Sequence, residues 1–422
     1  MNEEIEMVKK SITIIIVLIC VFMVGCGNCK ENISSLNENK NIDKINNKDN
    51  DSEEKQEDVL KVYSTENNDM IQRTIELFQS KNPDIKLEYI IGDGEKNIDV
   101  LNELEKGNGP DIIIPDESLK NAMLECNVLL NMEGKISLSD NIPIFEDWSN
   151  KYIIPLRFEL PFLFTKNELY SIEKVIYNVE DFCITEVNFN ELVQILYMYY
   201  YGSLKDLNQM IDKKLLEQFV NNVIYLAKEK NIIEGTQIKA VQDDDLYMIK
   251  KFTLGEDTIM YHFAKSIDDI KYYISATGME RGKADIVQKS AFPSVEIAIN
   301  RNSKYKSECI KFIEMALSKE IQIVDSQNGF PVNEYVLDNL GKSYVKSDEK
   351  IQIGIKKGVE ITIGDAEEFE IITMINLIKE VDKIYVKDER LVGILQEEIM
   401  KCYKQEKSII DTIDDIIERY EE

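Results

Sequence analysis

Few side chains in this sequence have the types and spacing that enzymatic chemistry requires. His262 is the only histidine, which argues against a histidine-based catalytic triad and a zinc-protease motif. The nucleophile motif Gly-x-Ser-x-Gly does not occur. The 78 Asp and Glu residues could include a carboxylate pair for glycoside hydrolysis, but no spacing selects one pair. Asp243-Asp244-Asp245 lacks the glycine and distal glutamate of a calcium loop. The sequence therefore predicts no catalytic residue, metal site or cofactor, and no enzyme.

The cysteine with the most informative surroundings is Cys26. Two lysines, Lys9 and Lys10, precede an apolar run from Ile14 to Val24, and Gly25 directly precedes the cysteine. This run is shorter than the ~20 apolar residues that a membrane-spanning helix needs, so it is typical of a secretory signal. Met23-Val24-Gly25-Cys26 resembles the lipobox of bacterial lipoproteins. That resemblance implies a signal peptide over residues 1–25, cleavage before Cys26 and lipid on the cysteine sulfur.

An uncleaved membrane anchor is the alternative interpretation of the N-terminal segment. Both interpretations place residues 30–422 outside the cytoplasm. The lipidated form would be held at the extracytoplasmic face of the cell membrane through Cys26.

The charge balance limits the possible partners. Lys and Arg number 50 against 78 Asp and Glu, a formal net charge of −28. Such a surface repels nucleic acid and anionic lipid headgroups, so neither is expected as a partner. The cysteines that follow Cys26 are odd in number and widely scattered, which argues against a disulfide scaffold. They are Cys29, Cys126, Cys183, Cys309 and Cys402.

Residues 27–58 are rich in Asn, Asp, Glu and Lys with few aliphatic residues. A segment with so little to bury is expected to be disordered. We therefore predict a lipidated, disordered tether over residues 26–58, ahead of a globular part that begins at residue 59.

The globular part opens with alternating strands and helices. Strands are predicted at 59–64, 85–91 and 111–115, and helices at 66–81, 99–105 and 117–126. Ile112-Ile113-Ile114 is apolar without alternation, as in a parallel sheet covered on both faces. Further on, the sequence predicts a proline-punctuated strand region at 152–165, helices over about 189–230, 303–317 and 369–420, and strands near 252–260 and 295–300.

Several segments, taken in order, resemble the extracellular solute-binding proteins of ABC importers, in the group that mostly takes up sugars. The resemblance covers roughly residues 59–420. The segments that carry it are Asn82-Pro83-Asp84, Gly109-Pro110-Asp111, Phe252-Thr-Leu-Gly255 with Met260, and the stretch from Ser303-Lys304 to Phe330-Pro331-Val332-Asn333.

The resemblance implies an α/β fold of two lobes, each a mainly parallel sheet flanked by helices, joined by a hinge. The first lobe would comprise 59–158 plus 292–325, and the second, helix-rich lobe 165–290 plus 335–422. The implied function is capture of a small solute between the two lobes, and carbohydrates are the usual ligands of the family. The protein would act as a monomer and deliver the solute to ABC importer permease subunits. The alternative is a degenerate relative that acts as a sensor or partner-binding lipoprotein without transport.

Ligand contacts in such a fold are expected on loops that follow strand ends. Tyr63 lies at the end of the first strand, Glu66 follows it, and Asp116 follows the third strand, although the same loops could simply cap helices. Trp148, the only tryptophan, could stack on a sugar ring, and a core or hinge position is its alternative. Tyr261 lies at a later strand end, where lobe packing is equally possible. These five residues are the predicted ligand contacts.

Overall fold

The computed structural model separates residues 1–56 from a compact unit of residues 57–422. The predicted signal peptide, Cys26 and the tether lie outside the residues that the structure describes. No helix among the described residues is long and apolar enough to cross a membrane. The described residues are 59–92, 96–146, 148, 150–165, 182–183, 188–200, 204, 210–229, 249, 253, 259–277, 284–286, 289–324, 328–348, 350–356, 359–385 and 388–421.

Three parallel strands begin the fold, as the alternating pattern predicts. β1 (Val59–Ser64) pairs in parallel with β2 (Lys86–Ile91) on one side and with β3 (Ile112–Ile114) on the other. Every residue of β3 is buried, which explains its unbroken apolar sequence. The connecting helices are α2 (Asp69–Lys81), α3 (Lys96–Glu105) and α4 (Glu117–Glu125). We call these strands and helices, with α11 (Lys306–Ala316), the first lobe.

Two long antiparallel strands extend the sheet beyond β3. β8 (Ser290–Ile299) pairs with β3, and β4 (Ile153–Thr165) pairs with β8. β6 (Ile259–Ala264) then pairs with the far half of β4. The described residues thus form a ten-stranded sheet in which β2-β1-β3-β8-β4-β6-β5 are neighbours. Its remaining strands are β5 (Phe182–Cys183), β7 (Ala284–Ile286), β9 (Phe330–Pro331) and β12 (Lys383–Ile384).

The expectation of parallel pairing holds in the first lobe and less well beyond it. β5 and β6 are parallel, but β4 pairs antiparallel with β6, β7, β8 and β9. The predicted strand near 252–260 starts later than expected, since Thr253 is helical and β6 begins at Ile259. A hairpin that the sequence analysis did not predict forms from β10 (Lys350–Lys356) and β11 (Val359–Gly364).

The hydrophobic core divides according to the faces of the sheet. A large cluster runs along one face, where Val62 and Ile112 of the first lobe and Phe164 of β4 are all buried. On the other face of β1 and β3, Tyr63 and Ile113 pack against α3 and α4. The helices that contribute to the large cluster are α2, α11, α10 (Ile267–Thr277), α12 (Lys319–Gln322), α13 (Glu334–Ser343) and α14 (Glu368–Lys379), with the short α5 (Pro143–Glu146).

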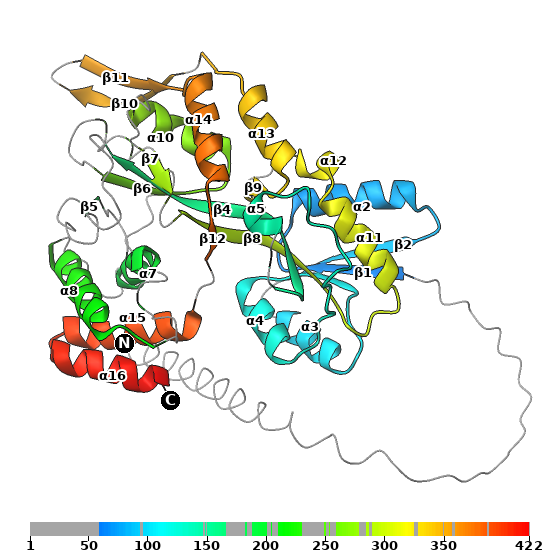
Figure 1. Cartoon of the computed structure of the whole chain (residues 1–422), viewed down its shortest axis with the longest axis horizontal. Coiled ribbons are helices and arrows are strands. Elements are labelled where there is room, and N and C mark those ends of the chain that lie inside the picture. Colours follow the sequence, from blue (N-terminus) through cyan, green and yellow to red (C-terminus); the bar gives the residue numbers. More distant parts are fainter. Residues whose placement is uncertain are drawn as a thin grey trace, which may run out of the picture. The chain divides into compact units, whose positions relative to one another are not determined.

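A separate group of four helices has its own core. These helices are α7 (Phe189–Tyr200), α8 (Lys213–Glu229), α15 (Glu389–Tyr403) and α16 (Ile409–Glu421), and their buried residues form one cluster. α15 and α16 lie side by side, with α7 and α8 next to them (Figure 1). We call β5, β6 and β7, together with this group, α10 and α14, the second lobe.

Candidate functional site

The loops that follow the three parallel strands meet at one edge of the sheet. The backbone N–H of Thr65 donates to Ile114 O at 3.1 Å, and the N–H of Gly92 donates to Ser64 O at 2.8 Å. Glu66 and Asp116 follow β1 and β3 at this edge, and both are exposed. Two of the predicted ligand contacts therefore stand on neighbouring loops, as expected for the carboxyl ends of parallel strands.

Tyr63 is linked to Asp116 through a residue that the sequence analysis did not identify. The Tyr63 hydroxyl donates to Asn97 Oδ1 at 2.7 Å, and Asn97 Nδ2 donates to Asp116 Oδ2 at 2.8 Å. The other carboxylate oxygen of Asp116 accepts from the N–H of Leu119 at 2.8 Å, so Asp116 also caps α4. The capping alternative for Asp116 is therefore confirmed, and its contact with a ligand stays a prediction.

The Tyr63 ring requires a glycine beside it. A Cβ on Gly92 would lie 1.9 Å from the Tyr63 hydroxyl oxygen. Tyr63 is only 1% exposed and packs against α3 and α4, so its ring cannot shift without disturbing that packing.

Gly92→Ala should therefore lower the free energy of unfolding by about 2 kcal/mol through overpacking. Chemical denaturation measures this change. Gly393→Ala is the matched control, because a Cβ there meets nothing within 4 Å. In the middle of α15 that substitution should instead raise stability by up to about 1 kcal/mol. Equal effects of the two substitutions would contradict the assigned contact.

A carboxylate and an ammonium group meet where β4 crosses from the first lobe to the second. Lys265 Nζ lies 3.3 Å from Glu159 Oε1, and the Glu159 side chain is 18% exposed. Burial raises the pKa of Glu159. The positive charge of Lys265 partly offsets this increase, and the negative charges of Asp269 and Glu66 add to it.

Aromatic rings lie on the same face of the sheet as Glu159. Phe292 is opposite Glu159 in the antiparallel register, and Phe263 is opposite Pro161, two residues further along β4. Directly opposed residues, and residues two apart, share a face. The Phe292 ring lies 4.8 Å from Phe263 and stacks at 4.1 Å on Tyr385. Phe263 and Phe292 are half-buried, so each residue keeps some exposed surface.

A second ion pair joins α4 to β8. Lys120 Nζ lies 2.7 Å from Glu296 Oε2 and 2.6 Å from Glu117 Oε2. Burial raises the pKa of Glu296, and the Lys120 charge opposes that change. This arrangement places a further carboxylate, Glu117, beside Asp116 in the first turn of α4.

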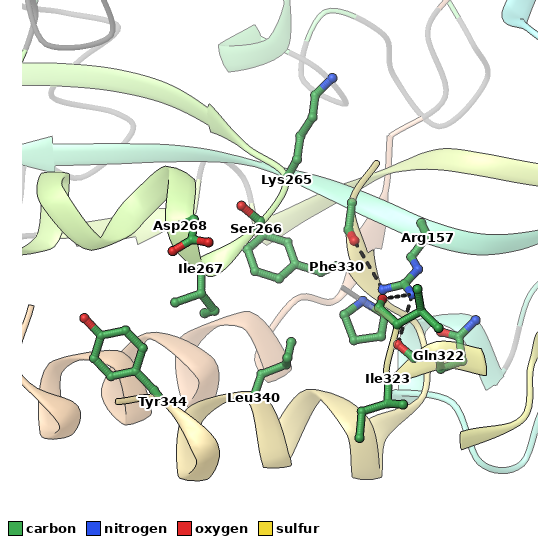
Figure 2. A pocket seen from close by; sticks show the side chains of 13 residues that line it. Arg157, Lys265, Ser266, Ile267, Asp268, Gln322, Ile323, Phe330, Leu340 and Tyr344 are labelled. Atoms are coloured by element: carbon green, nitrogen blue, oxygen red, sulfur yellow. Dashed lines mark hydrogen bonds between the residues drawn. The ribbon is translucent and has the colours of Figure 1, made fainter. Parts of the chain in front are cut away.

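A pocket of about 240 Å³ lies where β4, β9, α10 and α13 approach one another (Figure 2). Phe330 and Leu340 contribute apolar surface, and Ser266 and Asp268 contribute polar groups. The Lys265 side chain points away from the other residues around the pocket in Figure 2. Lys265 nevertheless lines the pocket, so the Glu159–Lys265 pair adjoins it. The other lining residues are Arg157, Ile267, Gln322, Ile323, Val324, Gly329, Pro331 and Tyr344.

Arg157 borders this pocket and links two segments of the chain. Its guanidinium donates to Gln322 O at 3.0 Å and to Val324 O at 2.9 Å, and more distantly to Gly329 O at 3.4 Å. The side chain is 2% exposed. The hydrogen bonds of Arg157 give it a bridging role, because they join β4 to the end of α12 and to the segment that follows it.

The other two predicted contacts lie elsewhere. Trp148 is half-buried, its Nε1–H donates to Ile153 O at 2.6 Å, and its ring lies 6.1 Å from Phe145. These contacts favour the core or hinge alternative for Trp148. Tyr261 lies within β6 and pairs with Leu163, three residues before the strand end. Their contact with a ligand, like that of Glu66 and Asp116, remains a prediction. Tyr63 is only 1% exposed, so its burial argues against direct contact with a ligand.

Sequence reasoning missed Asn97, Glu159 and Lys265. A signal for Glu159 exists, because it and Arg157 are the charged residues of an otherwise apolar strand. Such isolated charges in a buried strand mark a structural or functional position. Nothing in the sequence around Asn97 distinguishes it from the other asparagines of the chain.

No family model and no curated protein sequence matches the chain. Many solved structures do share its fold. A periplasmic oligogalacturonide-binding protein from Yersinia enterocolitica has a TM-score of 0.55 at 13% identity, covering 86% of this chain and 97% of that one. A periplasmic solute-binding protein from Pectobacterium atrosepticum has a TM-score of 0.54 at 14% identity, covering 86% and 97%. A de novo designed cysteine esterase has a TM-score of 0.55 at 12% identity, with the same coverage.

These similarities define the fold class. The chain has the two-lobe α/β fold of periplasmic sugar-binding proteins, in which sheets flanked by helices are joined by a hinge. The structures similar to it are mostly binding proteins.

Proposed function

We propose that this chain is an extracytoplasmic solute-binding protein that captures a small carbohydrate between its lobes and delivers it to an ABC importer. The lobes would be residues 59–158 plus 292–325 and residues 165–290 plus 335–422. Lipid on Cys26 would hold the protein at the membrane, with residues 26–58 as the tether. The protein would act without catalysis, since binding alone performs this function.

One observation carries the proposal. Glu159 of the crossing strand pairs with Lys265, which follows β6, beside the half-buried aromatic residues Phe263 and Phe292. The exposed acceptor groups of Glu66 and Asp116 stand at the strand ends of the first lobe. Carboxylates and ammonium groups hydrogen-bond sugar hydroxyls, and ring faces pack against the apolar face of a pyranose.

Ligand closure gives the first test. The full chain, kept in detergent because of its apolar N-terminal segment, is screened against maltotriose, xylotriose and trigalacturonate. A bound trisaccharide at 100 times its dissociation constant should add about 2.7 kcal/mol of stability. Solution scattering should also show a smaller radius of gyration, because the ligand stabilises the closed form. If no saccharide stabilises or compacts the protein, the sensor alternative replaces this proposal.

Glu159→Gln should weaken the best-binding trisaccharide about tenfold, equivalent to about 1.4 kcal/mol, because a charge-assisted hydrogen bond is lost. Calorimetric titration measures this affinity. Glu133→Gln is the matched control, since Glu133 forms an ion pair with Lys151 at 2.8 Å in which both side chains are at least half exposed. That variant should bind normally. Equal affinity of both variants would place the ligand elsewhere.

A further inference from the structure

Tyr63 is placed to hold another side chain in position rather than to contact a solute itself. Its ring is buried against α3 and α4, and its hydroxyl is turned toward Asn97. A side chain that is 1% exposed offers no surface to a solute. Any effect of Tyr63 on binding must therefore pass through the group that its hydroxyl holds.

The Asn97 carboxamide is held in one orientation from both ends. Its oxygen accepts from the Tyr63 hydroxyl at 2.7 Å, and its NH₂ group donates to Asp116 at 2.8 Å. Rotating the amide by 180° would place its oxygen against the Asp116 carboxylate, and two acceptors repel one another. The Tyr63 hydroxyl thus favours the orientation in which Asn97 is a donor toward Asp116.

Both oxygens of Asp116 are located by this arrangement. Oδ1 accepts from the N–H of Leu119 and Oδ2 accepts from Asn97, each at 2.8 Å. An ionised carboxylate has about four acceptor positions, so about two remain for another partner. Because the side chain is exposed at the edge where the strand loops meet, those positions are accessible from solvent.

We propose that Asn97, supported by Tyr63, is a positioning residue that fixes the Asp116 carboxylate as a pre-oriented acceptor for a solute hydroxyl. The proposal rests on the solute-binding function proposed above. Fixing a side chain before the ligand arrives removes part of the ordering cost of binding. Losing the support should therefore weaken binding even though neither Tyr63 nor Asn97 touches the solute.

Asn97→Asp tests this inference, because the introduced carboxylate still accepts from Tyr63 but repels Asp116. In the otherwise unchanged protein it should weaken the best-binding trisaccharide of the panel about fivefold. In an Asp116→Asn background the same change should cost less than about twofold. There the amide introduced at position 116 can donate to the carboxylate introduced at position 97, while the amide oxygen still caps α4. Equal losses in both backgrounds would overturn the positioning role and leave the solute-binding function intact.

A measurement without ligand separates the two proposals. Asn97→Asp should lower the folding equilibrium constant about tenfold in the otherwise unchanged protein and less than about twofold beside Asp116→Asn. Asn102→Asp, at an exposed position of the same helix, should have little effect in either background. If the unfolding effects of positions 97 and 116 are additive, Asn97 does not hold Asp116 and the inference fails, whatever saccharide binds. If they are coupled but no trisaccharide binds, the proposed function fails while the positioning of Asp116 stands.

Discussion

Replacing Arg157 with alanine should lower the free energy of unfolding by about 4 kcal/mol. Losses of this size are typical when a buried side chain with satisfied hydrogen bonds is truncated. The guanidinium donates to Gln322 O and Val324 O in an almost fully buried position. Truncation leaves those carbonyl oxygens without this donor and opens a cavity between β4 and the segment after α12. Urea denaturation with a constant m-value would measure the loss.

Arg301→Ala is the matched control for Arg157. Arg301 also donates to a main-chain oxygen, that of Asn127, but the side chain is exposed. Water replaces that bond, so the loss should stay within about 0.5 kcal/mol. If the two arginine variants were equally stable, the buried bonds of Arg157 would contribute nothing to holding the crossing segments together.

The second large effect is expected at Glu398, where Glu398→Gln should cost about 2 kcal/mol. The carboxylate side chain is 2% exposed and receives bonds from three cations, which join α15 to α16. Removing the negative charge leaves those cations close together without a counter-charge. They are Lys401 at 2.8 Å, Lys407 at 2.5 Å and Arg419 at 2.5 Å.

The pH dependence of this effect has a definite sign. Burial alone would raise the pKa of Glu398, but hydrogen bonds from its three cationic partners lower it from 4.5 to about 2. A lowered pKa stabilises the fold above the unfolded value and loses that contribution as the pH falls through the folded value. The difference between wild type and Glu398→Gln should therefore be full above about pH 5 and shrink between pH 4.5 and 2.

Glu397→Gln serves as the control, because Glu397 shares two of the same cations but is exposed. Its side chain is 52% exposed and pairs with Lys401 and Arg419 at 2.8 Å. Exposed pairs contribute little, so this variant should lose no more than about 0.5 kcal/mol. A loss as large as that of Glu398→Gln would show that burial does not distinguish the two carboxylates.

Local pattern was enough to predict the first lobe. The apolar run Ile112-Ile113-Ile114 and the alternation of strands and helices predicted three parallel strands, because each of these signals is contained in a short window. The hairpin at 350–364 was missed, although its alternating isoleucines are a strand signal. The mixed pairing of β4 was also missed, because strand order and direction depend on partners far away in the sequence.

The candidate site was predicted only where its residues follow strand ends. The sequence placed Glu66 and Asp116 at one edge of the sheet because loops after parallel strands share an edge, and their contact with a ligand stays a prediction. Glu159 and Lys265 are 106 positions apart, and the antiparallel register of β4 and β6 brings them together. Asn97 was not found because its role depends on the exact place where α3 begins relative to Tyr63. Such geometry has no signature in a single sequence.

The pairing of β3 with β8 has a consequence for the order in which the protein forms. Ile112 pairs with Ile299, so β3 lacks its second partner until about seven-tenths of the 422 residues have been made. Until then β3 presents an open edge of unpaired N–H and C=O groups, a template for wrong partners. Closing so long a loop is slow compared with forming a local hairpin. The incomplete chain, in which β3 has been made but β8 has not, is thus the species most prone to aggregate. A chaperone that shields the β3 edge at this stage would raise the yield of folded protein more than one that acts on the complete chain.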